Sequence, residues 1–159
     1  YRAVAGSEDL GALLEGMTLN EPRRYPKNSA IVEAVIAGEV EWGLVNHYYL
    51  LRALKENPHA PAANFYMPKG QASGFVNISG AGLLKKGAAA TRLLEFLLSD
   101  VAQRYFAQET FEYPLVAGID PSAELEPLEA LRTPDVDFGA VSDGFEETLV
   151  QISESGLVG

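Results

Sequence analysis

Residues 40–52 have the sequence VEWGLVNHYYLLR, in which a short apolar run passes directly into a helical pattern. The apolar run over residues 40–46 predicts a short buried strand, and residues 48–54 predict a helix. The tetrapeptide NHYY at residues 46–49 therefore lies where a strand gives way to a helix. Ligands collect at strand ends in open α/β sheets, and helix N-termini favour anions. This junction is the main candidate for a binding site.

Helical and extended patterns alternate along the rest of the chain. Helices are expected over residues 7–17, 28–37, 88–98, 101–108 and 138–155, and extended segments over residues 64–67, 74–84 and 112–116. Alternation of this kind predicts an α/β architecture. Proline and glycine cluster around residues 70–73, which predicts either a hinge between domains or a simple surface loop at that point.

The composition excludes several classes of function. The chain has 159 residues, of which 47% are hydrophobic and 21% are charged, and its formal net charge is -10. Such a charge repels the phosphates of nucleic acids and anionic lipids, so no nucleic-acid partner is expected. The absence of cysteine excludes disulfides and thiolate zinc sites, and two histidines are too few for a multi-histidine metal site within this chain. The apolar runs are too short to span a membrane.

The negative charge is concentrated at the end of the chain. Residues 105–159 carry 12 acidic side chains and 1 basic side chain. One interpretation is a solvated face that keeps the protein soluble. The other is an acidic interaction module that docks a basic protein partner. The sequence leaves both open.

Tyr48 and Tyr49 are candidate metal ligands. A phenolate oxygen is hard and anionic, which suits a highly charged cation such as Fe(III), and binding removes a proton whose free pKa is about 10. Arg52 follows three and four residues later on the same helical face, where it would keep the phenolates ionised or steady a bound anion. The alternative is that both tyrosines are amphipathic packing residues.

Asn28 has two interpretations. As an N-cap it satisfies the backbone of its own helix, which begins at Asn28 or Ser29. At a helix start that faces a cleft, its amide and the nearby N–H groups would hold an oxyanion instead.

The sequence contains no recognisable carboxylate pair, catalytic triad or nucleotide-binding glycine motif, so the chain is not expected to be an enzyme.

Several of these motifs occur together in one known family. They are YPKNS at residues 25–29, AVIAGEV at 34–40, GLVNHYYLLR at 43–52, GAG at 80–82, EFLLS at 95–99, QRYF at 103–106 and EYPLV at 112–116. In this combination the chain resembles the periplasmic ferric-iron-binding proteins of bacterial ABC importers, which are class II solute-binding proteins. The NHYY and EYPLV elements are the most specific part of the resemblance.

The resemblance implies a periplasmic-binding-protein-like class II fold, in which two α/β lobes close over the ion. It implies that Tyr48 and Tyr49 are iron ligands and that Asn28 and Asn46 hold a synergistic anion such as phosphate or carbonate. It also implies delivery of Fe(III) to the permease of an ABC importer. The implied location is the periplasm or another extracytoplasmic space, with the protein either free or lipid-anchored.

Members of this family are much longer than this chain, and the motifs of their N-terminal half have no match here. The chain also begins at Tyr1 without an initiator Met, so we expect a C-terminal portion with an incomplete two-lobe fold. Residues 1–73 are then part of the C-terminal lobe with the tyrosine pair. Residues 74–159 hold the hinge crossing, part of the N-terminal lobe and the C-terminal helices. The remaining iron ligands would come from the missing N-terminal half or from a partner chain.

A solute-binding protein for a different small ligand is the alternative within the same superfamily. Its ligand would be an oxyanion, a polyamine or a thiamine-like molecule, and the tyrosines would serve for stacking instead of metal binding.

Overall fold

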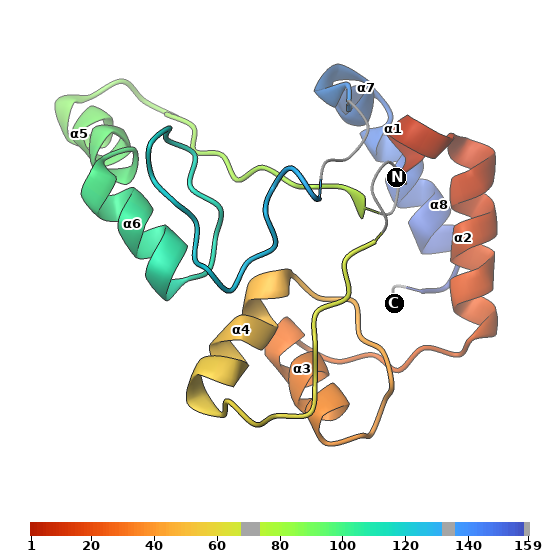
Figure 1. Cartoon of the computed structure of the whole chain (residues 1–159). Helices are drawn as coiled ribbons and strands as arrows, with labels where there is room; N and C mark the ends of the chain where they lie inside the picture. Colours follow the sequence, from red (N-terminus) through yellow and green to blue (C-terminus); the bar gives the residue numbers. More distant parts are fainter. Residues whose placement is uncertain (68–73, 132–135, 158–159) are drawn as a thin grey trace. The chain divides into compact units, whose positions relative to one another are not determined.

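The computed structural model describes residues 1–67, 74–131 and 136–157. Its contacts divide the chain into two compact units, which are considered separately below (Figure 1). Unit 1 consists of Tyr1–Arg24, Tyr66–Val76 and Glu129–Gly159, and unit 2 consists of Tyr25–Phe65 and Asn77–Leu128. No helix within the described residues is long and apolar enough to cross a lipid bilayer.

Unit 1 is built from helices at both ends of the chain. They are α1 (Arg2–Ala5), α2 (Ser7–Leu19), α7 (Phe138–Asp143) and α8 (Phe145–Glu154). Leu10 and Leu14 are buried because residues four apart lie on one face of α2, whereas Leu13 is largely exposed. The amide of Gln151 in α8 donates to the hydroxyl oxygen of Ser7 over 2.9 Å, which joins the two ends of the chain.

Unit 2 contains the predicted site. Its helices are α3 (Asn28–Ile36), α4 (His47–Glu56), α5 (Ala88–Leu97) and α6 (Asp100–Glu109). Helix α3 packs on α4, and α5 packs on α6. Leu51, Phe111 and Leu125 form a buried cluster, and Tyr48, Leu54 and Tyr113 pack against it. The first turn of α4 therefore rests on the core of its own unit.

The predicted helices are present in the structure. Helix α3 is followed by Gly38 with φ 71°, a conformation that glycine adopts without steric cost, so this residue ends the helix as expected. Helix α6 begins after Ser99, whose hydroxyl accepts the N–H of Ala102 over 3.4 Å. Helix α4 ends before Asn57, which precedes a proline and leaves the helical region.

The extended segments differ from the prediction. Within residues 1–67, 74–131 and 136–157 the structure contains no β-strand, so residues 40–46, 64–67, 74–84 and 112–116 are extended or irregular coil. A strand requires a neighbour to satisfy its N–H and C=O groups, and none of these segments pairs with another in a ladder. The α/β architecture is therefore not confirmed by these residues, and the structure is helical.

A close approach keeps residues 40–46 near α3. A Cβ atom at Gly43 would lie 2.4 Å from Cγ2 of Ile31 and 3.3 Å from Cγ2 of Val35, so glycine is needed where this segment crosses the helix. The other side of the segment is open: the side chains of Trp42 and Leu44 are 74% and 71% exposed.

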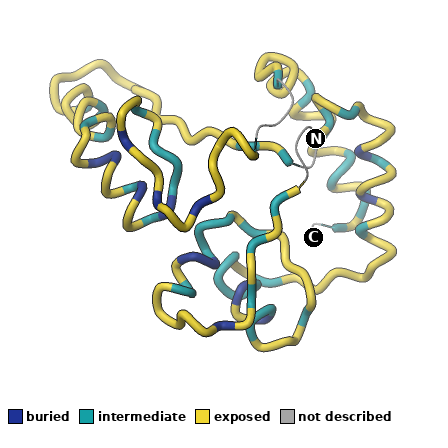
Figure 2. Tube along the Cα trace, viewed as in Figure 1, coloured by how far each residue is buried: buried dark blue, intermediate teal, exposed yellow. Residues whose placement is uncertain are grey.

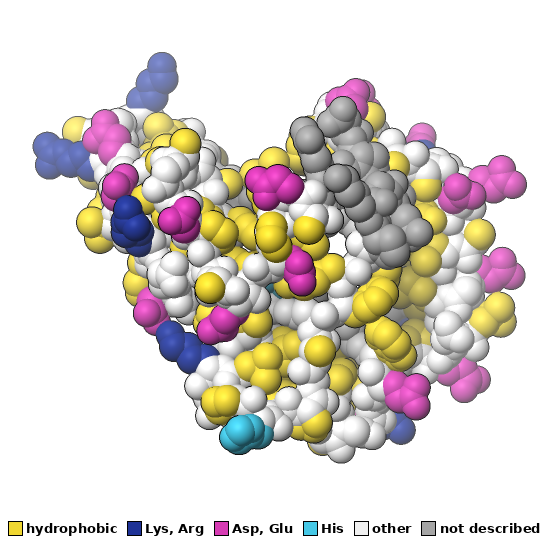
Figure 3. Space-filling view, viewed as in Figure 1, with side chains coloured by type: hydrophobic (Ala, Val, Ile, Leu, Met, Phe, Trp, Pro, Cys, Tyr) yellow, Lys and Arg dark blue, Asp and Glu magenta, His cyan; other side chains and the backbone are white. Residues whose placement is uncertain are grey.

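Buried positions are few in both units. Figure 2 shows them confined to short stretches, and most of the trace is partly or fully exposed. Figure 3 shows many hydrophobic side chains on the visible surface. The predicted break at residues 70–73 lies outside the described residues, and the division into lobe portions at residue 73 stays a prediction.

Candidate functional site

Asn46 precedes the first turn of α4 as its N-cap residue, in an extended conformation with φ -71° and ψ 139°. Its side chain does not cap the helix. Instead, Nδ2 of Asn46 donates to the hydroxyl oxygen of Tyr48 over 3.2 Å. The backbone N–H groups at the start of α4 are thus left without a side-chain cap, and their partial positive charge favours an anion.

Tyr48 and Tyr49 lie together rather than apart. Their ring centroids are 4.8 Å from each other, and the ring planes differ by 35°. Side chains of consecutive residues in a regular helix diverge by about 100°, so this pairing depends on their position in the first turn of α4. Both side chains are half-buried, which leaves each accessible to solvent on one side.

Arg52 lies over the tyrosine pair. Its guanidinium carbon is 5.0 Å from the ring centroid of Tyr48 and 5.8 Å from that of Tyr49. These distances are within the range of a cation–π interaction. The spacing of three and four residues along α4 therefore places a positive charge beside both phenol rings, and the predicted role of Arg52 toward the phenols or a bound anion stays a prediction.

The surroundings of Tyr48 favour its neutral form. Burial raises the pKa of the Tyr48 hydroxyl above its ordinary value, and the neighbouring Tyr49 hydroxyl and the Glu112 carboxylate raise it further. The hydrogen bond from Asn46 acts in the opposite direction but does not outweigh these causes. Tyr48 is therefore a neutral phenol at pH 7, and a cation that binds its oxygen has to displace the proton.

Asn28 is not the N-cap of α3. A cap at Asn28 requires the helix to begin at the following residue. Helix α3 instead begins at Asn28 itself, and its N-cap is Lys27, which is extended with φ -159°. The capping interpretation of Asn28 is therefore wrong, because a residue inside the first turn already has helical geometry. Asn28 and Asn46 lie at the N-terminal ends of two helices that pack against each other.

The structure also brings a distant segment to the tyrosines, which the local sequence did not reveal. Nε2 of His47 is 2.7 Å from the carbonyl oxygen of Phe111, and the His47 ring lies 5.7 Å from that of Tyr113. The EYPLV motif that follows Phe111 is thus part of the surroundings of the site. A separation of 64 residues leaves no local pattern from which this contact can be predicted.

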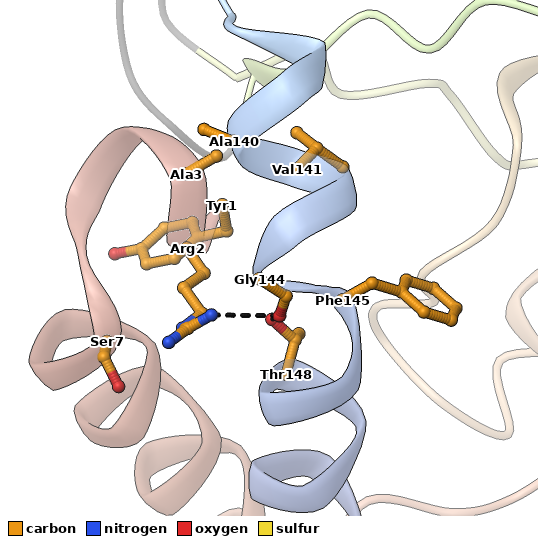
Figure 4. Close-up of a pocket in the computed structure, with 9 residues that line it drawn as sticks. All are labelled: Tyr1, Arg2, Ala3, Ser7, Ala140, Val141, Gly144, Phe145 and Thr148. Atoms are coloured by element: carbon orange, nitrogen blue, oxygen red, sulfur yellow. Dashed lines mark hydrogen bonds between the residues drawn. The ribbon is translucent and has the colours of Figure 1, made fainter.

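No group of three or more His, Cys, Asp or Glu side chains within the described residues is arranged to hold a metal ion. A pocket of about 320 Å³ occurs in unit 1, between the N-terminal residues and helices α7 and α8 (Figure 4). Arg2 reaches into it, but its guanidinium already donates to the carbonyl oxygen of Gly144 over 2.9 Å and pairs with Glu147. The positive charge of the Arg2 side chain in this pocket is thus neutralised within unit 1.

Comparison with known proteins gives several relatives, although no family model matches the chain. Iron uptake protein A2 of Synechocystis is 35% identical over 133 residues, which are 75% of this chain and 38% of that protein. The Fe(3+)-binding periplasmic protein of Serratia marcescens is 29% identical over 140 residues, or 84% of this chain and 41% of that protein. The chain is thus similar to part of several bacterial proteins that are named for iron uptake or ferric-iron binding. The major ferric iron-binding protein of Neisseria meningitidis, 32% identical over 126 residues, is a further example.

These findings confirm the resemblance that the motifs indicated. The chain spans 38% to 41% of the length of these three relatives, so it corresponds to only part of each. Their names describe the binding or uptake of iron, and none names a catalysed reaction. This agrees with the expectation that the chain is not an enzyme.

Proposed function

We propose that Tyr48 and Tyr49 bind Fe(III) as adjacent phenolates in a protein that carries the ion to an ABC importer. The observation that carries this proposal is the paired arrangement of the two rings, 4.8 Å apart, at the start of α4. Phenolate is a hard anionic ligand, and a trivalent cation is the partner that its charge suits. The iron-related names of the homologues support the same cargo.

A synergistic anion, phosphate or carbonate, would bind beside the iron. The uncapped N–H groups of α4 favour negative charge, and Asn46 and Arg52 lie next to the tyrosines. Asn28 is the remaining candidate, since its amide is not used to cap α3. The anion would neutralise part of the charge of the cation and occupy coordination positions that this chain leaves open.

The rest of the iron shell would come from outside this chain. Two phenolates and one anion leave positions on Fe(III) for the part of the protein that the relatives have and this chain does not cover, or for a partner chain. In the complete protein we expect two class II lobes that close over the ion, with residues 1–73 and 74–159 contributing to different lobes. The expected location is periplasmic or otherwise extracytoplasmic, free or lipid-anchored, with an importer permease as partner.

The test is the tyrosinate-to-iron charge-transfer band in the visible spectrum. Fe(III) supplied as its citrate complex with phosphate should give this band, and Tyr48→Phe or Tyr49→Phe should each weaken or abolish it. Tyr105→Phe is the matched control, because this tyrosine is 58% exposed on α6 in the same unit. A double Tyr48/Tyr49 variant that binds Fe(III) with an unchanged band would refute the assignment.

The dependence on pH provides a second test of the same proposal. Because the pKa of Tyr48 is raised, the phenol has to lose its proton when iron binds. Affinity should therefore fall as the pH falls, by about tenfold per pH unit for each proton released. Competition with citrate between neutral and mildly acidic pH measures this slope once the protons that citrate itself binds over that range are subtracted, and a flat corrected profile would mean that the phenols stay protonated.

A second candidate is an oxyanion-binding protein without iron. It is favoured by the raised pKa of Tyr48, because a neutral phenol donates a hydrogen bond to an anion. Arg52 and the N-terminus of α4 would supply positive charge. Calorimetry with phosphate and sulfate, with and without Fe(III), discriminates between the two: anion affinity that Arg52→Ala removes and that Fe(III) leaves unchanged supports the second candidate.

A further inference from the structure

We propose that His47 is a positioning residue for the tyrosine pair, and that it acts through its hydrogen bond to the carbonyl oxygen of Phe111. This inference deepens the proposed function and rests on it for its effect on iron. A chain of contacts leads from the backbone carbonyl of Phe111, through the imidazole of His47, to the neighbouring rings of Tyr48 and Tyr49.

The first contact determines the state of the imidazole. Nε2 of His47 is 2.7 Å from the Phe111 carbonyl oxygen, and because a carbonyl only accepts, Nε2 carries the hydrogen. That nitrogen has no free lone pair for a metal ion. The second anchor is at the main chain, where Nδ2 of Asn64 donates to the carbonyl oxygen of His47 over 3.0 Å. His47 is thus held at both its ring and its backbone, and a metal ion could approach only its other ring nitrogen, Nδ1.

The carbonyl that accepts this bond is itself fixed. The Phe111 side chain is 2% exposed and packs in the core with Leu51 and Leu125. Its φ of 57° lies in the left-handed region, which a bulky residue adopts only where its surroundings enforce it. The next N–H, that of Glu112, donates to the carbonyl oxygen of Phe106 over 3.0 Å. The direction of the Phe111 carbonyl is therefore set by the core and by α6.

The remaining contacts lead from the imidazole to the phenols. The ring centroids of His47 and Tyr48 are 5.4 Å apart in an edge-to-face arrangement, and Tyr113 lies on the same imidazole at 5.7 Å. Tyr48 in turn contacts Tyr49. Loss of the His47 hydrogen bond would release the imidazole from its orientation and remove the surface against which Tyr48 rests. The two phenol oxygens would then be less well oriented for one cation.

The experiment compares side chains with and without a donor at position 47. His47→Phe keeps an aromatic ring but removes the donor, and we expect a loss of about tenfold in Fe(III) affinity together with a shifted charge-transfer band. His47→Gln retains an N–H that reaches the carbonyl and should restore most of the affinity and the band position. His59→Phe is the matched control, because His59 is the other histidine in the chain and is exposed.

Near-UV circular dichroism of the metal-free protein provides a readout that does not depend on iron. The paired tyrosine rings should give a signal that His47→Phe reduces and His47→Gln preserves. If the wild-type protein lacks the visible iron band but its tyrosine signal follows this pattern, the proposed function fails and the positioning role stands. If His47→Phe does not fold by far-UV dichroism, His47→Met is the donor-free variant to compare with His47→Gln. A donor-free variant that folds with wild-type affinity, band and tyrosine signal would overturn the proposal.

Discussion

Residues 40–46 and residues 112–116 of unit 2 were both predicted to be extended, yet the structure holds these two regions in different ways. Residues 111–116 are fixed by buried groups: Phe111 is in the core, and the side-chain oxygen of Gln103 accepts the N–H of Leu115 over 2.7 Å. Residues 40–46 touch α3 through Gly43, but the side chains of Trp42 and Leu44 are 74% and 71% exposed. Neither segment pairs in a ladder within the described residues.

The difference shows what replaces a sheet when no neighbouring strand is present. An extended backbone is held in place where side chains satisfy its polar groups and where a large residue anchors it in the core. Residues 111–116 have both kinds of support, whereas residues 40–46 contact α3 at Gly43 and have no buried large side chain. Both segments contact the region of the tyrosine pair: Phe111 through His47, and Asn46 through the hydroxyl of Tyr48.

The largest effect is expected from Phe111→Ala. Truncation of this buried ring removes the anchor of residues 111–116 and leaves a cavity beside Leu51, which should lower the free energy of unfolding by about 3 to 5 kcal/mol. Urea denaturation followed by circular dichroism measures the change. Phe96→Ala is the control, because Phe96 is 54% exposed on α5. Equal losses in the two variants would mean that residues 111–116 are no better anchored than the surface.

A smaller loss is expected from Gln103→Ala. The Gln103 side chain is 3% exposed, and it donates to the carbonyl oxygen of Leu97 over 2.7 Å while it accepts the N–H of Leu115. Its removal leaves two partly buried backbone groups without this side-chain partner, at a cost of about 2 kcal/mol in the free energy of unfolding. The control is Gln108→Ala, an exposed position on the same helix. Similar stability of both variants would contradict the supporting role of Gln103.

The helices could be predicted from the sequence, because their signals are local. Apolar spacing and glycine or proline stops placed α3, α4, α5 and α6 close to their observed bounds, and the cap at Ser99 placed the start of α6. The strands could not be predicted in this way, because a strand forms only when another strand pairs with it, and its own sequence does not specify that partner. Residues 40–46 have an apolar run typical of a buried strand, yet burial of Trp42 and Leu44 requires a neighbour that these residues lack.

The candidate site was predictable only in part. The positions of Asn46, Tyr48, Tyr49 and Arg52 follow from one helix start, so their proximity could be inferred from spacing along the chain. The contact of His47 with Phe111 depends on tertiary packing and was missed. The roles of the tyrosines as iron ligands, and of Asn28 and Asn46 as anion ligands, stay predictions.

Gly43→Val tests the contact that holds residues 40–46. A Cβ at this position would lie 2.4 Å from Cγ2 of Ile31, so the added side chain has to push the segment away from α3. Overpacking of this kind should cost about 1 to 2 kcal/mol in the free energy of unfolding. Combination with Ile31→Ala should recover part of this loss by removing the clashing atoms. Additive losses in the double variant would show that Gly43 is not packed on Ile31.

The smallest effect is expected from Trp42→Ser. The Trp42 ring contacts the ring of Phe65 at 5.8 Å in an edge-to-face arrangement, and Phe65 is itself 63% exposed. A contact between two exposed rings should contribute about 0.5 to 1 kcal/mol at most to the free energy of unfolding. A double-mutant cycle with Phe65→Ser isolates this pairwise energy. A loss as large as that of Gln103→Ala would instead mean that residues 40–46 are covered in solution, and that they are as firmly held as residues 111–116.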